Sequence, residues 1–170
     1  FQLAIHSETR QTTVYTLVPV KPETLGPQLH PHPANTPCTT LPPRAAPDPS
    51  QQPVPAPGLP PVCGGIRRMA PSVPGRVRWA ARNVNIGLIA SALTNLANLD
   101  RPVIDRTDLA GTYDFTLEWT PEFGGPTTVN TGSGPGFEEA LKQQLGLRLL
   151  SRKSLVDVMI GDHIARPSDN

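Results

Sequence analysis

Apolar and polar residues alternate at the start of the chain with the period of two that a half-buried strand shows. Phe1, Leu3 and Ile5 share one face, and residues 13–20 are rich in β-branched and aromatic side chains. Residues 8–11 between these two segments are polar, as in a turn. The pattern therefore predicts an N-terminal β-hairpin over residues 1–20.

The next stretch, residues 21–75, has neither a helical nor a strand period. It contains most of the 22 prolines of the chain, in runs such as Pro42-Pro43 and residues 53–57. Proline has a fixed φ and no N–H donor, so it is excluded from helix interiors and central strands. We therefore expect residues 21–75 to be a largely irregular linker or insert outside the folded core.

Helical and strand periods return after this stretch. From Ile86 to Leu99, apolar residues recur at steps of three and four, which is the pattern of an amphipathic helix. Asn83 or Asn85 can cap this helix by accepting a backbone N–H. The elements predicted here are strand 76–82, helix 86–99, strand 103–105 and strand 113–119.

A second unit repeats this order. Pro135 suits the first turn of a helix that carries Phe137, Leu141 and Leu145, and Gly146 is a natural left-handed C-cap. The strands predicted around this helix are a short one at 127–129 before it, and 147–150 and 155–160 after it.

Together these patterns predict the α+β fold class, with an antiparallel or mixed sheet and two helices on one face. The core, residues 76–165, consists of tandem strand–helix–strand–strand units, to which the hairpin 1–20 and the proline-rich loop are added. Residues 166–170 are polar and are expected to form a frayed tail.

Composition excludes several classes of function. A formal net charge of +1, with 17% charged residues, provides no basic surface for nucleic acid. No apolar run reaches the length of a transmembrane helix. The chain begins at Phe1, inside a strand pattern, so we interpret it as part of a longer protein and take no localisation from a leader sequence.

The two cysteines, Cys38 and Cys63, both lie in the proline-rich stretch. They either form one disulfide, if the compartment is oxidising, or remain two free thiols in a loop. A disulfide closing a loop of this length would stabilise the fold by about 3–4 kcal/mol in the chain-entropy model.

Candidate catalytic and metal-binding groups are weak. Asp100, Asp105 and Asp108 fall at predicted turns, where Asp bonds to nearby backbone, and Asp114 and Glu118 fall on the polar face of a strand. A structural role therefore explains these carboxylates better than a catalytic acid–base pair.

A metal site is not favoured either. His30, His32 and Cys38 lie near one another, but a proline-rich loop does not hold ligands in the fixed geometry that a metal requires. Ser133 follows a glycine ahead of a helix, yet it has no visible His partner for nucleophilic catalysis. The sequence predicts no catalytic residue, no metal ligand and no cofactor.

Trp79 and Trp119 are the candidate binding residues. Both occupy strand positions, where aromatic side chains usually belong to the core. If either of them proved exposed, it would mark a binding surface.

Several blocks of the sequence resemble an uncharacterised protein family that is greatly expanded in soil acidobacteria. These blocks are residues 1–10, residues 105–121, residues 139–147 and residues 164–170. The resemblance covers nearly the whole chain outside the proline-rich stretch, although the N-terminal part of the family is missing. The chain has Asp100 and Asp108 where the family usually has Gly, and Ser154-Leu155 where it has Gly-Pro.

The resemblance implies a secreted or envelope-anchored protein with no established catalytic residues. Some family members are joined to a membrane metallopeptidase of the BlaR sensor type. The strand–helix–strand–strand order, with a leucine-rich helix ending in Gly146-Leu147, is also similar to the short N-terminal domain of secretins and TonB-dependent receptors. That similarity implies contact with a protein partner in the periplasm.

Three functions are therefore carried forward. The first is a non-catalytic extracytoplasmic module that binds an envelope protein, which an exposed strand edge without a pocket would favour. The second is a ligand-sensing domain associated with a BlaR-type peptidase, which an apolar pocket between sheet and helices would favour. The third is an unrecognised hydrolase, which a deep polar cleft with converging carboxylates would favour.

Overall fold

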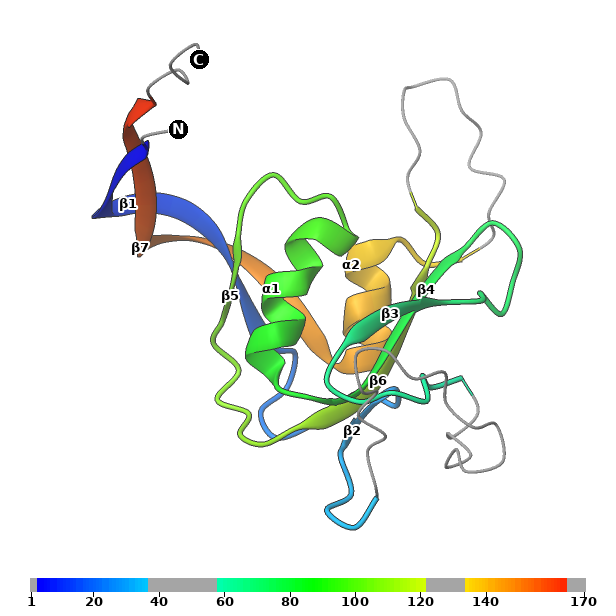
Figure 1. The fold of residues 1–170 in the computed structure, drawn as a ribbon. Coiled ribbons are helices and arrows are strands. Elements are labelled where there is room, and N and C mark those ends of the chain that lie inside the picture. Colours follow the sequence, from blue (N-terminus) through cyan, green and yellow to red (C-terminus); the bar gives the residue numbers. More distant parts are fainter. Residues whose placement is uncertain (1–2, 37–57, 122–133, 165–170) are drawn as a thin grey trace.

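The computed structural model describes residues 3–36, 58–121 and 134–164, and within them it has seven strands in two sheets and two short helices (Figure 1). This arrangement confirms the α+β fold class. The strands are β1 (Leu3–Pro19), β2 (Leu29–Pro31), β3 (Ile66–Met69), β4 (Val77–Val84), β5 (Val103–Asp105), β6 (Tyr113–Trp119) and β7 (Leu147–Ile164). The helices are α1 (Ile86–Leu96) and α2 (Phe137–Ala140), and α2 continues as the π-helical segment η1 (Leu141–Leu145).

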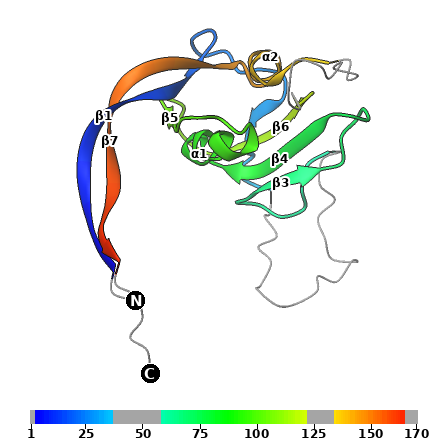
Figure 2. The same cartoon turned by 90° about the horizontal axis from the view of Figure 1, so that it is seen from above.

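The elements are divided between two sheets rather than gathered in the one that the sequence predicts. One sheet has the order β5-β1-β7, and the other has the order β2-β6-β4-β3. Figures 1 and 2 show both helices between β4 of the second sheet and the ribbon of β1 and β7. The apolar core therefore fills the space between the sheets and around the helices.

The core is assembled from the apolar faces that the sequence pattern predicts. In α1, Ile86, Ile89 and Leu93 are almost completely buried, and each such side chain contributes about 1.5–3 kcal/mol of transfer free energy. The Asn85 side chain caps the helix by accepting a hydrogen bond of 2.7 Å from the Leu88 N–H. The helix ends at Leu96, one turn before the predicted end at Leu99.

The end of η1 is joined closely to the segment that follows β1. Gly146 has a φ of 71°, so it is the left-handed C-cap that the sequence predicts. Its carbonyl accepts from Val20 N–H at 2.8 Å, and the carbonyl of Leu145 accepts from Gly26 N–H at 2.9 Å. A Cβ on Gly26 would lie 2.4 Å from the carbonyl oxygen of Gln144, so only glycine allows this close approach.

The predicted N-terminal hairpin is wrong. Residues 3–19 form one continuous strand that pairs antiparallel with β7, from Leu3 opposite Ile164 to Pro19 opposite Leu147. The segment from Glu8 to Gln11 is polar because both of its faces are exposed, and it contains none of the Gly, Pro, Asn or Asp residues that favour a turn.

The same reason explains the second error. The sequence pattern predicts two separate strands, 147–150 and 155–160, but the residues between them continue β7 without a break. The second unit therefore has one long strand after its helix. The predicted strand 127–129 and the tail 166–170 lie outside the described residues.

The proline-rich stretch contains two short strands that the sequence pattern does not predict. β2 pairs with β6 and β3 pairs with β4, and Leu29 of β2 is fully buried. Both strands are at the edges of the four-stranded sheet. Proline is tolerated at an edge because its missing N–H would face away from the neighbouring strand.

β1 and β7 continue beyond the core as a two-stranded ribbon, which Figure 2 shows leaving the body and carrying both ends of the described chain. At its base, Val14 and Leu17 are completely buried. From residue 4 to residue 12, every residue of β1 is exposed. We call residues 3–12 and 154–164 the arm.

The glycine contact at the end of η1 gives the first prediction. Gly146→Ala should lower the free energy of unfolding by about 2 kcal/mol or more, because a left-handed residue with a Cβ is strained and the new Cβ would lie 2.6 Å from Gly26 N. Urea denaturation followed by tryptophan fluorescence measures the loss. Gly65→Ala is the control, because its Cβ would meet nothing within 4 Å. Equal losses in the two variants would contradict the prediction.

Candidate functional site

The arm has two open edges in the described part of the chain. β5 pairs with β1 only at Tyr15, Thr16 and Leu17, and β7 pairs with no strand except β1. An unpaired strand edge presents a row of N–H and C=O groups to which another chain can bond. The arm therefore offers two edges for pairing with a further strand.

Apolar side chains are also unusually exposed on the arm. Ile5, Leu155 and Met159 are 54%, 67% and 77% exposed, and the last two are the most exposed large apolar residues of the described chain. All three lie on one face of the ribbon, because Gln11 is opposite Leu155 and Ser7 is opposite Met159. Thr9 and Asp157 lie between Leu155 and Met159 on this face, so these are separate exposed apolar side chains that a molecule covering the face would contact.

Three polar contacts join side chains along the arm. Arg10 donates to Glu8 at 2.8 Å, the Thr9 hydroxyl donates to Asp157 at 2.6 Å, and His6 Nδ1 lies 2.9 Å from an Asp162 oxygen. The hydrogen bond from Arg10 lowers the pKa of Glu8, and the same bond raises the pKa of Arg10. Glu8 and Arg10 are therefore both charged over the whole physiological range of pH.

Trp79 and Trp119, which would mark a binding surface if exposed, line one groove beside the helices. Its volume is about 990 Å³, and Leu96, Leu99 and Phe137 complete its apolar wall. The rest of the lining consists of Arg68, Val77, Ala97, Asn98, Thr120, Pro121, Gly136, Glu138, Glu139 and Lys142. The groove thus combines an apolar wall with charged groups of both signs.

Neither tryptophan is exposed enough to form a binding patch on the surface by itself. Trp119 is 4% exposed and packs against Phe137 edge to face, with ring centroids 5.3 Å apart, while Trp79 is half-buried. The expectation that both belong to the core holds for Trp119. Their convergence on one groove depends on the pairing of β4 with β6, where Trp79 is opposite Leu117 and Val77 is opposite Trp119.

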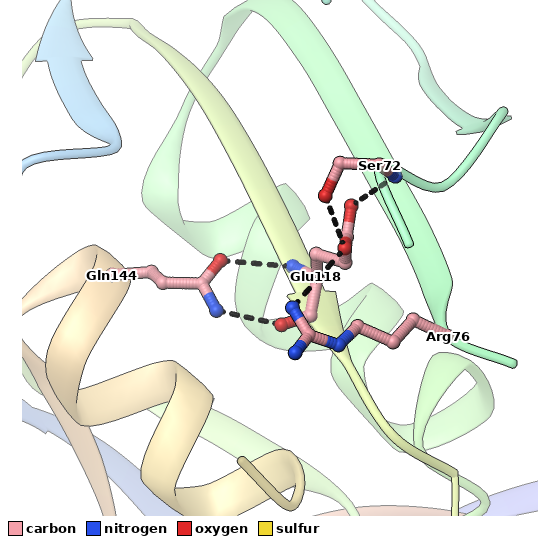
Figure 3. A network of polar contacts seen from close by, with 4 residues as sticks. All are labelled: Ser72, Arg76, Glu118 and Gln144. Carbon is pink, nitrogen blue, oxygen red and sulfur yellow. Dashed lines mark hydrogen bonds and ion pairs between the residues drawn. The ribbon is translucent and has the colours of Figure 1, made fainter. Parts of the chain in front are cut away.

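The polar face of β6 carries a network centred on Glu118 (Figure 3). Its carboxylate accepts from the Ser72 N–H at 2.9 Å and from the Ser72 hydroxyl at 2.6 Å, and Arg76 lies 3.6 Å away. Burial raises the pKa of Glu118, but the Ser72 bonds and the charges of Arg78 and Arg76 outweigh it and hold the pKa below 4.5. Through these contacts, the Glu118 carboxylate anchors the loop before β4 to β6.

The Gln144 side chain completes the pairing of β6. Its oxygen accepts from the Glu118 N–H at 2.9 Å and its nitrogen donates to the Glu118 carbonyl at 2.6 Å. Further along, the main chains of Gln28 and Pro135 accept from Thr116 and Thr120. The amide therefore takes the place of a strand residue ahead of the start of β2 and fixes η1 to the sheet (Figure 3).

A second buried pair lies at the other end of β6. His32 Nδ1 is 2.7 Å from an Asp114 oxygen, and the same oxygen accepts from Asn83 N–H at 2.9 Å. His32 and Asn83 line a cavity of about 510 Å³ whose other lining residues are Pro31, Ala34, Thr36, Ala110, Gly111 and Thr112. Through these contacts Asp114 links His32, which follows β2, and Asn83 of β4 to β6.

The other three carboxylates considered from the sequence, Asp105, Asp108 and Asp100, lie at the end of β5 or in the turns and loops around it. Asp105 accepts from the N–H and the hydroxyl of Thr107 at 2.9 and 2.8 Å, and Asp108 is left-handed with a φ of 59°. Asp100 pairs with Arg101 on the surface. In the ranges that the structure describes, no group of three His, Cys, Asp or Glu side chains could hold a metal ion.

Cys63 is half of a disulfide, whereas Cys38, the other cysteine of the sequence, lies outside the described residues. The pairing of Cys38 with Cys63 stays a prediction. Within the described part, no helix is long and apolar enough to cross a bilayer.

Sequence reasoning missed the arm and the role of Gln144. The β-branched Thr9 and Thr12, within and next to the polar segment, are a local signal for the continuity of β1. No local signal identifies Gln144, because its partners are main-chain groups 26 residues earlier in the chain.

The network around Glu118 gives a pH prediction. Its pKa is lower in the folded than in the unfolded chain, so the unfolded chain binds more protons as the pH falls. The stabilisation is present above about pH 4.5 and is lost as the pH falls through the folded pKa. Glu118→Gln should therefore lose less stability than the wild type between about pH 6 and about pH 3.

Denaturant unfolding at the two pH values measures this difference. Glu138→Gln removes an exposed carboxylate that lies outside the network and serves as the matched control. If Glu118→Gln and the wild type lost the same free energy over this range, the anchoring role of Glu118 would be wrong.

A comparison with models of protein families gives a match that covers nearly the whole chain. A family model described as "Protein of unknown function (DUF3738)" matches residues 1–164, a range that runs to the end of β7 and so includes the arm. Neither the search of curated proteins nor the search of solved structures found a significant match. The chain therefore belongs to this family of proteins of unknown function.

Proposed function

We propose that the chain is a non-catalytic, extracytoplasmic interaction module that contacts another protein chain through its arm. The observation that carries the proposal is the ribbon itself, whose outer edges have no strand partner in the described part of the chain. Addition of a strand to such an edge is a common mode of protein recognition, because main-chain hydrogen bonds supply affinity and alternate side chains supply specificity.

The stability of the arm supports the same proposal. A two-stranded ribbon is at best marginally stable alone in water, because it has no third strand or helix against which to bury an apolar face. Ile5, Leu155 and Met159 remain exposed here. A partner that covered this ribbon would supply the missing layer.

Two further observations support an extracytoplasmic location. Cys63 is disulfide-bonded, and disulfides persist mainly in oxidising compartments such as the periplasm or the cell exterior. The sequence blocks at 105–121 and 139–147 also resemble a family whose members look secreted or envelope-anchored.

Photo-crosslinking in cells tests the proposal. A benzophenone side chain at position 155 or 159 of the arm should form adducts with a second polypeptide several-fold more efficiently than one at Leu88. Leu88 is the control because it is 42% exposed on α1 in the body. Equal yields at Leu88 and at the arm positions would contradict the role of the arm. Adducts found only with cytoplasmic proteins would contradict the location.

The groove favours a second candidate function, a ligand-sensing domain associated with a BlaR-type membrane peptidase. The Trp79, Trp119 and Phe137 rings form the apolar wall, and Arg68, Lys142, Glu138 and Glu139 also line the groove, so it suits an amphipathic ligand with an apolar body and a charged group. This function uses a different face of the molecule from the arm.

An anionic naphthalene dye, 8-anilinonaphthalene-1-sulfonate, tests the groove. The wild type should bind it saturably at one site, and Ala97→Arg should weaken binding by at least about tenfold because Ala97 lines the groove. Leu88→Arg adds the same charge to an exposed position of α1 outside the groove and should leave binding unchanged. Non-saturable binding, or equal binding by both variants, would exclude the groove as the site.

A further inference from the structure

We propose that the outer edge of β1 in the arm pairs antiparallel with β1 of a second copy of this chain, with Thr9 at the two-fold axis. The inference rests on the proposed function, since it names the occupant of an edge that the proposal leaves open. The resulting sheet would have the order β7-β1-β1-β7 across two copies.

The direction of the main-chain groups of β1 identifies the edge. Tyr15 N–H donates to the Pro102 carbonyl, and the Leu17 carbonyl accepts from Arg106 N–H, so the odd-numbered residues of β1 face away from β7. The pairing with β7 has no register shift after Ile5. Because successive residues of a strand alternate in direction, residues 5, 7, 9, 11 and 13 present their N–H and C=O groups on this same edge.

The length of the open edge is set by β5. It occupies the edge only from Tyr15 to Leu17, so the nine residues from Ile5 to Thr13 are available. A second β1 strand running antiparallel and centred on Thr9 would use the whole of this segment. Each of its odd-numbered residues would then exchange two main-chain hydrogen bonds with the first copy.

Charge complementarity fixes the register. A two-fold axis at Thr9 places Glu8 opposite Arg10 of the second copy and Arg10 opposite its Glu8, and opposite charges directly across two strands are stabilising. An axis at residue 8 would oppose two glutamates, and an axis at residue 10 would oppose two arginines. A slip of the pairing by one residue would put side chains from opposite faces of the two ribbons next to each other.

The other residues of the segment fit the same register. Ser7 would face Gln11 of the second copy, His6 would face its Thr12, and Thr9 would face Thr9. All of these side chains are exposed in the single copy, so none has to leave the core. No pair in this register brings two like charges together.

The outer edge of β7 is the competing surface. Val156, Val158 and Ile160 are arranged symmetrically about Val158, so two β7 strands could match their apolar residues there. That register would place Lys153 opposite His163 of the second copy and would match no pair of opposite charges. A register centred on Leu155 would instead place Lys153 opposite Asp157 of the second copy, so charge pairing is available on both edges. We take the β1 edge, where every residue from Ile5 to Thr12 is exposed, and the proline variants below decide between the two edges.

Two proline variants separate the edges. Thr9 and Asp157 are directly opposite each other, and the N–H of each points outward from the ribbon. Thr9→Pro and Asp157→Pro both remove the hydrogen bond between these residues, but each blocks only the outer edge of its own strand. The two variants therefore differ chiefly in which outer edge can no longer pair, that of β1 or that of β7.

Sedimentation equilibrium of the purified full chain provides the readout. The wild type and Asp157→Pro should be dimers, and Thr9→Pro should raise the dimer dissociation constant by at least about tenfold. A wild type that stays monomeric up to a few hundred micromolar would overturn the proposal. Loss of the dimer in Asp157→Pro but not in Thr9→Pro would also overturn it, in favour of the β7 edge.

Charge reversal tests the register without proline. Glu8→Arg and Arg10→Glu should each weaken self-association, because each places like charges opposite each other. An equimolar mixture of the two variants should restore the dimer as a heterodimer, since one chain would then present two basic side chains at positions 8 and 10 and the other two acidic ones. Failure of the mixture to associate more tightly than either variant would sink the proposed register. Only purified chain is present in these experiments. A negative result would therefore contradict self-association without contradicting binding of another protein, which the cross-linking test measures separately.

Discussion

The pairing of β1 with β7 is the interaction on which the rest of the molecule depends. It joins the first strand of the chain to the last over 17 residues of β1. At the base, Val14, Leu17 and Leu147 are completely buried and close one side of the core. Beyond residue 13 toward the start of the chain, the same ladder continues with both edges open and with residues 4–12 of β1 exposed. The same ladder of β1 and β7 thus closes the core at its base and leaves exposed strand edges in the arm.

The body provides the rigid support that such an arm requires. β6 is buried along its whole length, and its neighbours are held to it by contacts of different kinds. Gln144 extends its pairing on one side, Glu118 holds the loop before β4, and Asp114 fixes His32 of the segment after β2. These polar groups are used for anchoring, which explains why a dense set of carboxylates forms no converging acid–base site among the described residues. The groove with Trp79 and Trp119 is separate from them and retains the second candidate function.

Features that depend on local sequence could be predicted, and features that depend on distant partners could not. Asn85 caps α1 and Gly146 is left-handed because each needs only its own neighbours. The polarity of the segment from Glu8 to Gln11 reflects its exposure on both faces and not a turn, and its pairing with β7 makes it part of a strand. Leu29 was missed for the related reason that its strand is short, lies among prolines and is recognised only by its pairing with β6. The groove likewise requires Trp79 and Trp119 to come together across a sheet.

Residue-resolved amide hydrogen exchange of the arm tests the central claim most directly. The even-numbered amides of His6, Glu8 and Arg10 face β7 and should be more protected than their odd-numbered neighbours at low protein concentration. The odd-numbered amides of Ser7, Thr9 and Gln11 face the outer edge, and their protection should rise with concentration as that edge is covered. Odd-numbered amides that exchange rapidly at all concentrations and in the presence of envelope extract would show that the edge has no partner, and would contradict the account.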